Sequence, residues 1–143
     1  MASKLFNSAL RDEATGAIDF DTDTFYAMLV TATYAPNSDT HTKRSDVTNE
    51  VPNGGGYTTA GQAVTVTVAA VDTANDKVVI TVAAHNWATA TITARGEVIY
   101  KRRGGLASAD ELVFYNDFGA DIVSTGGTFA VAASTVTKTN GNP

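Results

Sequence analysis

The sequence has no cysteine, three prolines and few charged residues, which make up 17% of the chain. Without cysteine it contains no disulfide, no thiolate nucleophile and no cysteine-ligated zinc site. Leucine and glutamate, which favour helices, are scarce, whereas threonine, alanine and valine are abundant. Because β-branched residues suit pleated strands, the composition predicts a mainly β protein whose surface carries threonine hydroxyls in place of the usual lysine and glutamate.

The chain also lacks a long apolar run and an excess of positive charge. No stretch approaches the roughly 20 apolar residues that cross a bilayer, and the start of the chain, MASKLFNSALRDEATG, lacks the apolar core of a signal peptide. We therefore expect synthesis in a cytoplasm. The net charge of -5 at pH 7 argues against affinity for nucleic acid or for an anionic membrane. A length of 143 residues predicts one domain with a sizeable core.

Alternation of β-branched or aromatic residues with polar residues predicts a series of strands. The segment 25–34 is apolar on both faces, which indicates a strand that is covered on both sides. Asp72–Lys77 supplies turn residues that join two strands in a hairpin. The one helix candidate is 37–49, where Ser38 or Asp39 could cap a short turn. The remaining predicted strands are 63–71, 77–84, 89–102, 112–115 and 128–136.

This arrangement of short strands around one long excursion fits an all-β, antiparallel β-sandwich in a single domain. We place the sandwich at residues 17–137, after an N-terminal arm at 1–16 and before a polar C-terminal tail at 138–143. The excursion, 37–56, is polar and is therefore a candidate contact surface rather than a catalytic lid.

Two groups of residues are candidate partner contacts. The apolar residues of the arm predict a segment that pairs with an exposed strand edge of a neighbouring molecule; they are Leu5, Phe6 and Leu10. The second group is basic and consists of Lys43, Arg44, Lys101, Arg102 and Arg103. On an acidic protein, the basic run 101–103 could dock an acidic partner surface. Alternatively, its charges keep a strand end from aggregating, and both interpretations stay open.

Three alternating aspartates, Asp19, Asp21 and Asp23, resemble the start of a calcium-binding loop. An EF-hand loop needs glycine at its sixth position and glutamate at its twelfth. Counting from Asp19, those positions hold Thr24 and Val30. The motif therefore predicts a solvated turn that leads into a strand, and no metal site.

The two histidines, His41 and His85, are too few and too far apart in the sequence to predict a zinc site. We expect both to be structural, and His85 to cap a turn. The single tryptophan, Trp87, is expected to anchor the core. Gly54–Gly56 is followed by Tyr57 rather than by the lysine of a phosphate-binding loop, and no nucleophile elbow is present. The sequence therefore predicts no catalytic residue, no metal ligand and no cofactor, and so not an enzyme.

Several strings of the sequence carry a resemblance. They include IDFDTDT from Ile18, SDVTNEV from Ser45, ANDKVV from Ala74, VIYK from Val98 and DFGAD from Asp117. Together they resemble strings of tailed-phage virion proteins, in particular the small capsid cement (decoration) protein of short-tailed phages. The likeness covers roughly residues 20 to 129.

This resemblance implies a jelly-roll β-sandwich, made in the cytoplasm of a bacterial host, that sits on the outer surface of the phage head. Such a protein binds the major capsid protein, clamps neighbouring copies of it and stabilises the head. Association with itself, as a homodimer or another symmetric oligomer, would use one patch on both copies. No interface residue can be matched one by one, and the runs around Gly96 and at 101–105 depart from the expected pattern.

Other functions make different predictions. A carbohydrate-binding or receptor-binding sandwich of a head fibre or tail would show an exposed aromatic platform. A tail-completion or head-tail joining protein would form a ring and occur in few copies per particle. A glycan depolymerase would need carboxylates clustered in a cleft, and no such pairing is visible in the sequence.

Overall fold

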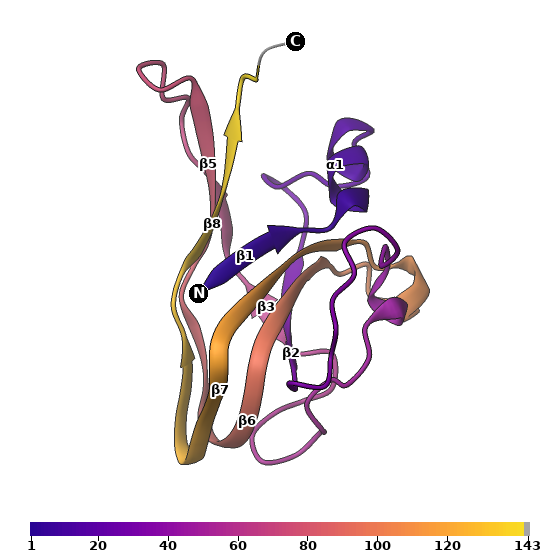
Figure 1. Cartoon of the computed structure of the whole chain (residues 1–143), viewed down its shortest axis with the longest axis vertical. Helices are drawn as coiled ribbons and strands as arrows, with labels where there is room; N and C mark the ends of the chain where they lie inside the picture. Colours follow the sequence, from indigo (N-terminus) through magenta and orange to yellow (C-terminus); the bar gives the residue numbers. More distant parts are fainter. Residues whose placement is uncertain (142–143) are drawn as a thin grey trace.

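Residues 1–141, the part of the chain that the computed structural model describes, form two antiparallel β-sheets packed face to face. The larger sheet has the strand order β1-β7-β6-β2-β3, and the smaller sheet has the order β4-β5-β8. In Figure 1 the smaller sheet stands along the left of the molecule, with β5 and β8 rising above the larger sheet. The predicted all-β antiparallel sandwich in a single domain is confirmed.

The two longest strands form the centre of the larger sheet. They are β6 (His85–Lys101) and β7 (Leu112–Val131), which pair with each other along most of their length. On one side, β7 pairs with β1 (Ala2–Leu5). On the other side, β6 pairs with β2 (Phe25–Val30), which in turn pairs with β3 (Gln62–Val64).

The smaller sheet contains the predicted hairpin. β4 (Val66–Val68) pairs with β5 (Lys77–Val82), and the Asp72 backbone N–H donates to the Lys77 carbonyl across the turn at 2.9 Å. The third strand is β8 (Ser134–Thr139). The strand predicted at 63–71 is in fact divided between the two sheets, as β3 and β4.

The two sheets are joined through β6 and β7. The chain passes from β5 to β6 and from β7 to β8 through two residues each, and the strand pairing continues from Val82 opposite Ser134 to His85 opposite Val131. β6 and β7 then bend together at the lower end of the molecule in Figure 1, next to the register shifts that follow Trp87. Strands that are consecutive in the chain often lie side by side: β2 pairs with β3, β4 with β5 and β6 with β7. The sandwich is therefore as predicted, but these neighbours do not follow the interleaved order of a jelly roll.

The helical segments differ from the prediction. The α-helix is α1 (Asn7–Ala14), inside the segment expected to be an arm. The predicted helix at 37–49 is wrong: within it only η1 (Arg44–Asp46), a single 3-10 turn, is helical. A second 3-10 turn, η2 (Ala107–Ala109), precedes β7. Among residues 1–141, no helix is both long enough and apolar enough to cross a membrane.

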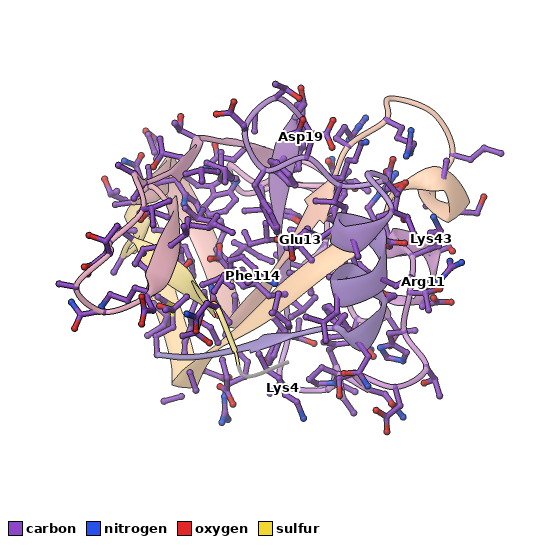
Figure 2. All side chains as sticks on the ribbon, turned by 90° about the horizontal axis from the view of Figure 1, so that it is seen from above. Lys4, Arg11, Glu13, Asp19, Lys43 and Phe114 are labelled. Atoms are coloured by element: carbon purple, nitrogen blue, oxygen red, sulfur yellow. The ribbon has the colours of Figure 1, made fainter. Side chains whose placement is uncertain are left out.

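The core fills both faces of the central strands. β2 is buried on both sides, as predicted: Ala27, Leu29 and Val30 are fully buried, and Phe25 and Met28 nearly so. In the view of Figure 2, Phe114 of β7 lies in the interior, whereas Lys4, Asp19 and Lys43 lie around the periphery.

The two terminal segments belong to the sandwich. β1 pairs with β7 of its own chain, with Ala2 opposite Asp117 and Leu5 opposite Phe114. The first part of the tail predicted at 138–143 extends β8 to Thr139. The backbone N–H of Asn140 then donates to the Asp76 carbonyl at 3.0 Å. The last part of that predicted tail, 142–143, lies outside the described residues.

Candidate contact surfaces

The smaller sheet carries a row of threonines on its outer side. The strand register places Thr67 of β4 opposite Thr81 of β5, and Thr81 opposite Thr135 of β8. Neighbouring strands lie about 4.8 Å apart, so the three side chains form one row across the sheet. In the next row Val79 lies opposite Thr137. We call these five residues the threonine face.

Strand alternation explains why these side chains point outward. Their neighbours along β5 and β8, Ile80, Val82 and Val136, are buried in the core, and successive residues of a strand point to opposite faces. Figure 1 shows the outer side of β5 and β8 with no other element over it. None of the five residues is charged. The sheet has two charged residues, and both are engaged within the chain: Nζ of Lys77 lies 4.0 Å from Oδ2 of Asp72, and Nζ of Lys138 lies 2.6 Å from Oε2 of Glu13.

A groove of about 660 Å³ lies on the outer side of the larger sheet. Its floor is formed by Thr91, Thr93 and Arg95 of β6, and its walls by 31–33, 51–55 and Asp121. Arg95 lies at one end, with its Nε 2.8 Å from Oδ1 of Asp117. We call this site the outer groove, and part of its wall belongs to the excursion proposed above as a contact surface.

The glycine run Gly54–Gly56 packs against β6. The Thr91 backbone N–H donates to the carbonyl of Gly55 at 2.8 Å. A side chain on Gly55 would meet the Thr91 carbonyl oxygen at 2.8 Å, and one on Gly56 would meet Cα of Ala90 at 2.9 Å. Only glycine allows this close approach, which shapes the wall of the outer groove.

The fold brings the two basic runs together around two buried carboxylates. We call the five basic residues, Lys43, Arg44, Lys101, Arg102 and Arg103, the basic end. Within it, Nε of Arg44 lies 2.8 Å from Oδ2 of Asp110, which is fully buried. Nε of Arg103 donates to Oε1 of Glu111 at 2.6 Å. Although burial of Glu111 opposes ionisation, hydrogen bonding from Arg103 holds the Glu111 pKa below its ordinary value.

The remaining basic side chains are also engaged within the chain. Nζ of Lys101 lies 2.8 Å from Oδ2 of Asp23, and the guanidinium of Arg102 lies 4.8 Å from the centre of the Tyr26 ring. These contacts weigh against the basic end as a docking surface for an acidic partner, because its charges already have partners within the chain. Arg103 keeps a solvent-accessible side chain, 44% exposed.

The three apolar residues of the predicted arm have different environments. Phe6 is only 1% exposed and packs in the chain's own core, so the prediction that it contacts a partner is wrong for this fold. Leu5 is half-buried and packs beside the core. Leu10 lies on α1 with half of its surface in solvent, and it alone of the three remains available to a partner.

The aspartate motif forms the predicted turn. The backbone N–H of Asp21 donates to Oδ1 of Asp19 at 2.9 Å, and that of Asp19 donates to Oδ2 of Asp23 at 2.8 Å. Hydrogen bonds from Thr22 and the Asp21 backbone lower the pKa of Asp19. The aspartate oxygens therefore serve the turn itself. Among residues 1–141, no group of three or more metal-ligating side chains is gathered at one place.

Most aromatic residues are in the core, and Tyr26 and Phe118 are half-buried. Trp87 is 5% exposed, as predicted, and packs edge-on against Phe129 at 6.0 Å between ring centres. Tyr34, Tyr57 and Tyr100 are also buried. A carbohydrate-binding site that depends on an exposed aromatic platform therefore finds no such platform on these residues.

Sequence reasoning predicted threonine hydroxyls on the surface but missed the threonine face. Composition says nothing of their positions, and only the register of β4, β5 and β8 shows that three of them form a row. It also missed the buried pair of His85 and Glu97, because they are twelve residues apart along β6 and no local motif marks them.

Comparisons of the chain with protein-family models, with curated proteins and with solved structures found no match.

Proposed function

We propose that this chain is a structural virion protein of a bacteriophage, which binds the outer surface of the capsid and cements neighbouring major capsid proteins. The resemblance in sequence suggests this role, and one structural observation carries it. That observation is the threonine face, an uncovered and uncharged strand surface on a protein whose net charge is -5.

Such a face is suited to binding a flat protein surface through many weak contacts. Threonine and valine are branched at Cβ and hold few rotamers, so little side-chain entropy is lost when the face is covered. Because no charge lies in the row of Thr67, Thr81 and Thr135, covering it desolvates no ion. The hydroxyl groups can exchange water for polar groups of a flat protein surface.

The outer groove supplies a second foothold. It lies on the outside of the larger sheet, whereas the threonine face lies on the outside of the smaller sheet. The two surfaces therefore point away from each other, so one molecule can touch two neighbours at once. Two attachments on one rigid body raise the overall affinity through effective concentration, although each contact alone is weak.

Copy number tests the proposal at the level of the particle. We expect the chain to stain on a denaturing gel of purified virions at an intensity comparable to that of the major capsid protein. Absence from the particle, or a few copies per particle as in a joining ring, would contradict it.

A charge placed in the threonine face tests the surface itself. Thr81→Lys puts an ammonium in the middle of the row, and burying it against a flat partner costs several kcal/mol. We expect binding to capsids stripped of this protein to weaken at least about tenfold, measured by co-sedimentation.

The matched control is Thr73→Lys, which adds the same charge in the exposed turn that joins β4 to β5. It should bind like the natural protein, and both variants should keep the natural unfolding temperature. Equal binding by Thr81→Lys and the natural protein would exclude the threonine face as the contact.

A further inference from the structure

His85, the first residue of β6, is held between two hydrogen-bond acceptors. Its Nε2 lies 2.8 Å from Oε2 of Glu97, and its Nδ1 lies 2.9 Å from the carbonyl oxygen of Ala83. Neither a carbonyl nor a carboxylate can donate a proton. With Glu97 ionised, both ring nitrogens carry hydrogen, so that His85 is a cation beside the Glu97 anion. The side chains are 9% and 0% exposed.

The carboxylate extends this pair into a network that crosses both sheets. Oε1 of Glu97 accepts from Nδ2 of Asn116 at 2.7 Å, and the same Nδ2 lies 3.1 Å from Oγ of Ser134. The amide oxygen of Asn116 accepts from the hydroxyl of Ser3. The network thus joins β1, β6 and β7 of the larger sheet to β8 of the smaller sheet.

Among residues 1–141, His85 is the one basic side chain in ion-pair contact with Glu97. The other side chains that hydrogen-bond within the network or contact the His85 ring do not titrate near neutral pH; they are Ser3, Trp87, Asn116 and Ser134. The Glu97 charge is therefore balanced by His85 alone. If His85 loses its proton, a fully buried carboxylate is left without a counterion, which is strongly unfavourable.

We propose that His85 and Glu97 form a pH-dependent clamp that holds the two sheets and the N-terminal strand together. Protonated His85 closes the clamp. Its deprotonation removes the counterion of Glu97 and loosens the hydrogen bonds that lead through Asn116 to β1 and β8.

The direction of the pH effect follows from the pKa of His85. Burial of the ring opposes protonation, but the hydrogen bond and charge of Glu97 outweigh it and raise the pKa above its ordinary value of 6.5. A group whose pKa is raised by folding stabilises the folded state fully below the unfolded pKa. That stability is lost as the pH rises through the folded pKa, so the clamp weakens on the alkaline side of neutrality.

The clamp is connected to the threonine face by the backbone of β8. Ser134, the last member of the network, is followed directly by Thr135. Opening the clamp would therefore free the strand that carries one side of the face. This consequence rests on the proposed function, whereas the clamp itself does not, and the experiment below uses the isolated protein so that the two can fail separately.

Proton NMR of the two histidines tests the clamp directly. The chain has only His41 and His85, so assignment needs a single variant, His41→Gln. Nδ1 of His41 lies 2.9 Å from the hydroxyl oxygen of Tyr34 and 3.3 Å from the backbone nitrogen of Asn37. Within residues 1–141 no carboxylate forms an ion pair with this ring, whereas Glu97 does so with His85, which makes His41 a matched control. We expect the ring protons of His85 to keep the shift of the protonated form at pH values where the unfolded chain has lost that proton.

Thermal unfolding of the natural protein and of His85→Gln supplies the second readout. The unfolding temperature of the natural protein should fall as the pH rises from about 6 to about 9, and that of His85→Gln should not show this dependence. His41→Gln should keep it. A His85 that titrates no higher than the histidines of the unfolded chain, or parallel pH profiles for the natural protein and His85→Gln, would overturn the clamp. If His85→Gln does not fold, the His85 titration in the natural protein decides the question.

Discussion

At the scale of single residues, Gly61 is the glycine at which an added side chain would come closest to another segment of the fold. It has a φ of +79° and lies just before β3, against the backbone of β2. A side chain there would meet the carbonyl oxygen of Ala27 at 1.7 Å and Cα of Met28 at 2.9 Å. Since the contacting atoms belong to backbone in the middle of the sheet, they cannot move aside without breaking β2 from its neighbours.

Gly61→Ala should therefore destabilise the protein severely. The substitution combines a left-handed backbone conformation, which alone costs about 1 kcal/mol for alanine, with a collision against backbone. We expect a loss of at least about 3 kcal/mol in the free energy of unfolding, measured by urea denaturation.

Gly104→Ala is the matched control for this prediction. Gly104 has a similar φ of +87°, but a side chain there meets nothing within 4 Å. Gly104→Ala should therefore lower the free energy of unfolding by only about 1 kcal/mol. Equal losses in the two variants would show that conformation, and not the contact with β2, makes Gly61 necessary.

Whether a residue is buried can be predicted from the sequence where its immediate neighbours in the chain decide its burial. Trp87 was assigned to the core because a large aromatic flanked by small residues follows a strand, and it is buried. Phe6 was assigned to a partner surface because it precedes a polar turn, and it is buried too. The difference is that the burial of Phe6 depends on β1 pairing with β7, more than 100 residues later, which no local pattern encodes.

At the scale of elements, the N-terminal segment is part of the folded domain, and not a free arm, because it pairs with the larger sheet. β1 closes one edge of the larger sheet, and α1 follows it with Ala9 buried. Phe6, between them, joins the apolar cluster that includes Met28, Tyr34 and Tyr115. The segment is therefore part of the folded domain, and removing it would uncover core residues.

Two substitutions separate this role from that of a free arm. Phe6→Ala should lower the free energy of unfolding by about 3 to 5 kcal/mol, as expected for an aromatic side chain deleted from a core. Leu10→Ala, on the exposed side of α1, should change it by less than about 0.5 kcal/mol. Chemical denaturation of both variants checks the prediction, and a small loss for Phe6→Ala would indicate that β1 is not docked on β7 in solution.

Local hydrogen bonding explains why one segment predicted to be helical is not. The amide oxygen of Asn37 accepts from the backbone N–H groups of Asp39 and Thr40, and Oδ2 of Asp46 accepts from those of Thr42 and Lys43. These contacts satisfy donors that a helix would have used, which is why Asn and Asp favour turns over helix interiors. Conversely, α1 begins without a side-chain cap, so its start carried no signal in the sequence.

At the scale of the whole molecule, the fold class was predictable because alternation is a local signal repeated along the chain. Each strand showed which residues point inward, as Ile80 and Val82 of β5 do. The pairing of strands was less accessible, because β6 and β7 pair with several register shifts that are set by packing across the sheet. The candidate contact surface depends on this pairing, so composition indicated threonine on the surface but did not locate the threonine face.

The salt dependence of capsid binding distinguishes the threonine face from the basic end as the principal contact. Raising sodium chloride from about 0.1 M to about 1 M shortens the Debye length from about 10 Å to about 3 Å, which weakens contacts between exposed charges. Burial of an uncharged face has no such dependence. Since the basic side chains are already paired within the chain, we expect the dissociation constant to change less than about threefold over this range, measured by co-sedimentation at several protein concentrations.

Arg102→Gln provides the corresponding variant, because it removes one cation from the basic end without touching the threonine face. It should bind at both salt concentrations like the natural protein, whereas Thr81→Lys should fail at both. If the affinity instead falls more than about tenfold at high salt, and Arg102→Gln lowers it further at low salt, the basic end is the docking surface. In that event the row of threonines serves only as the solvated side of the smaller sheet.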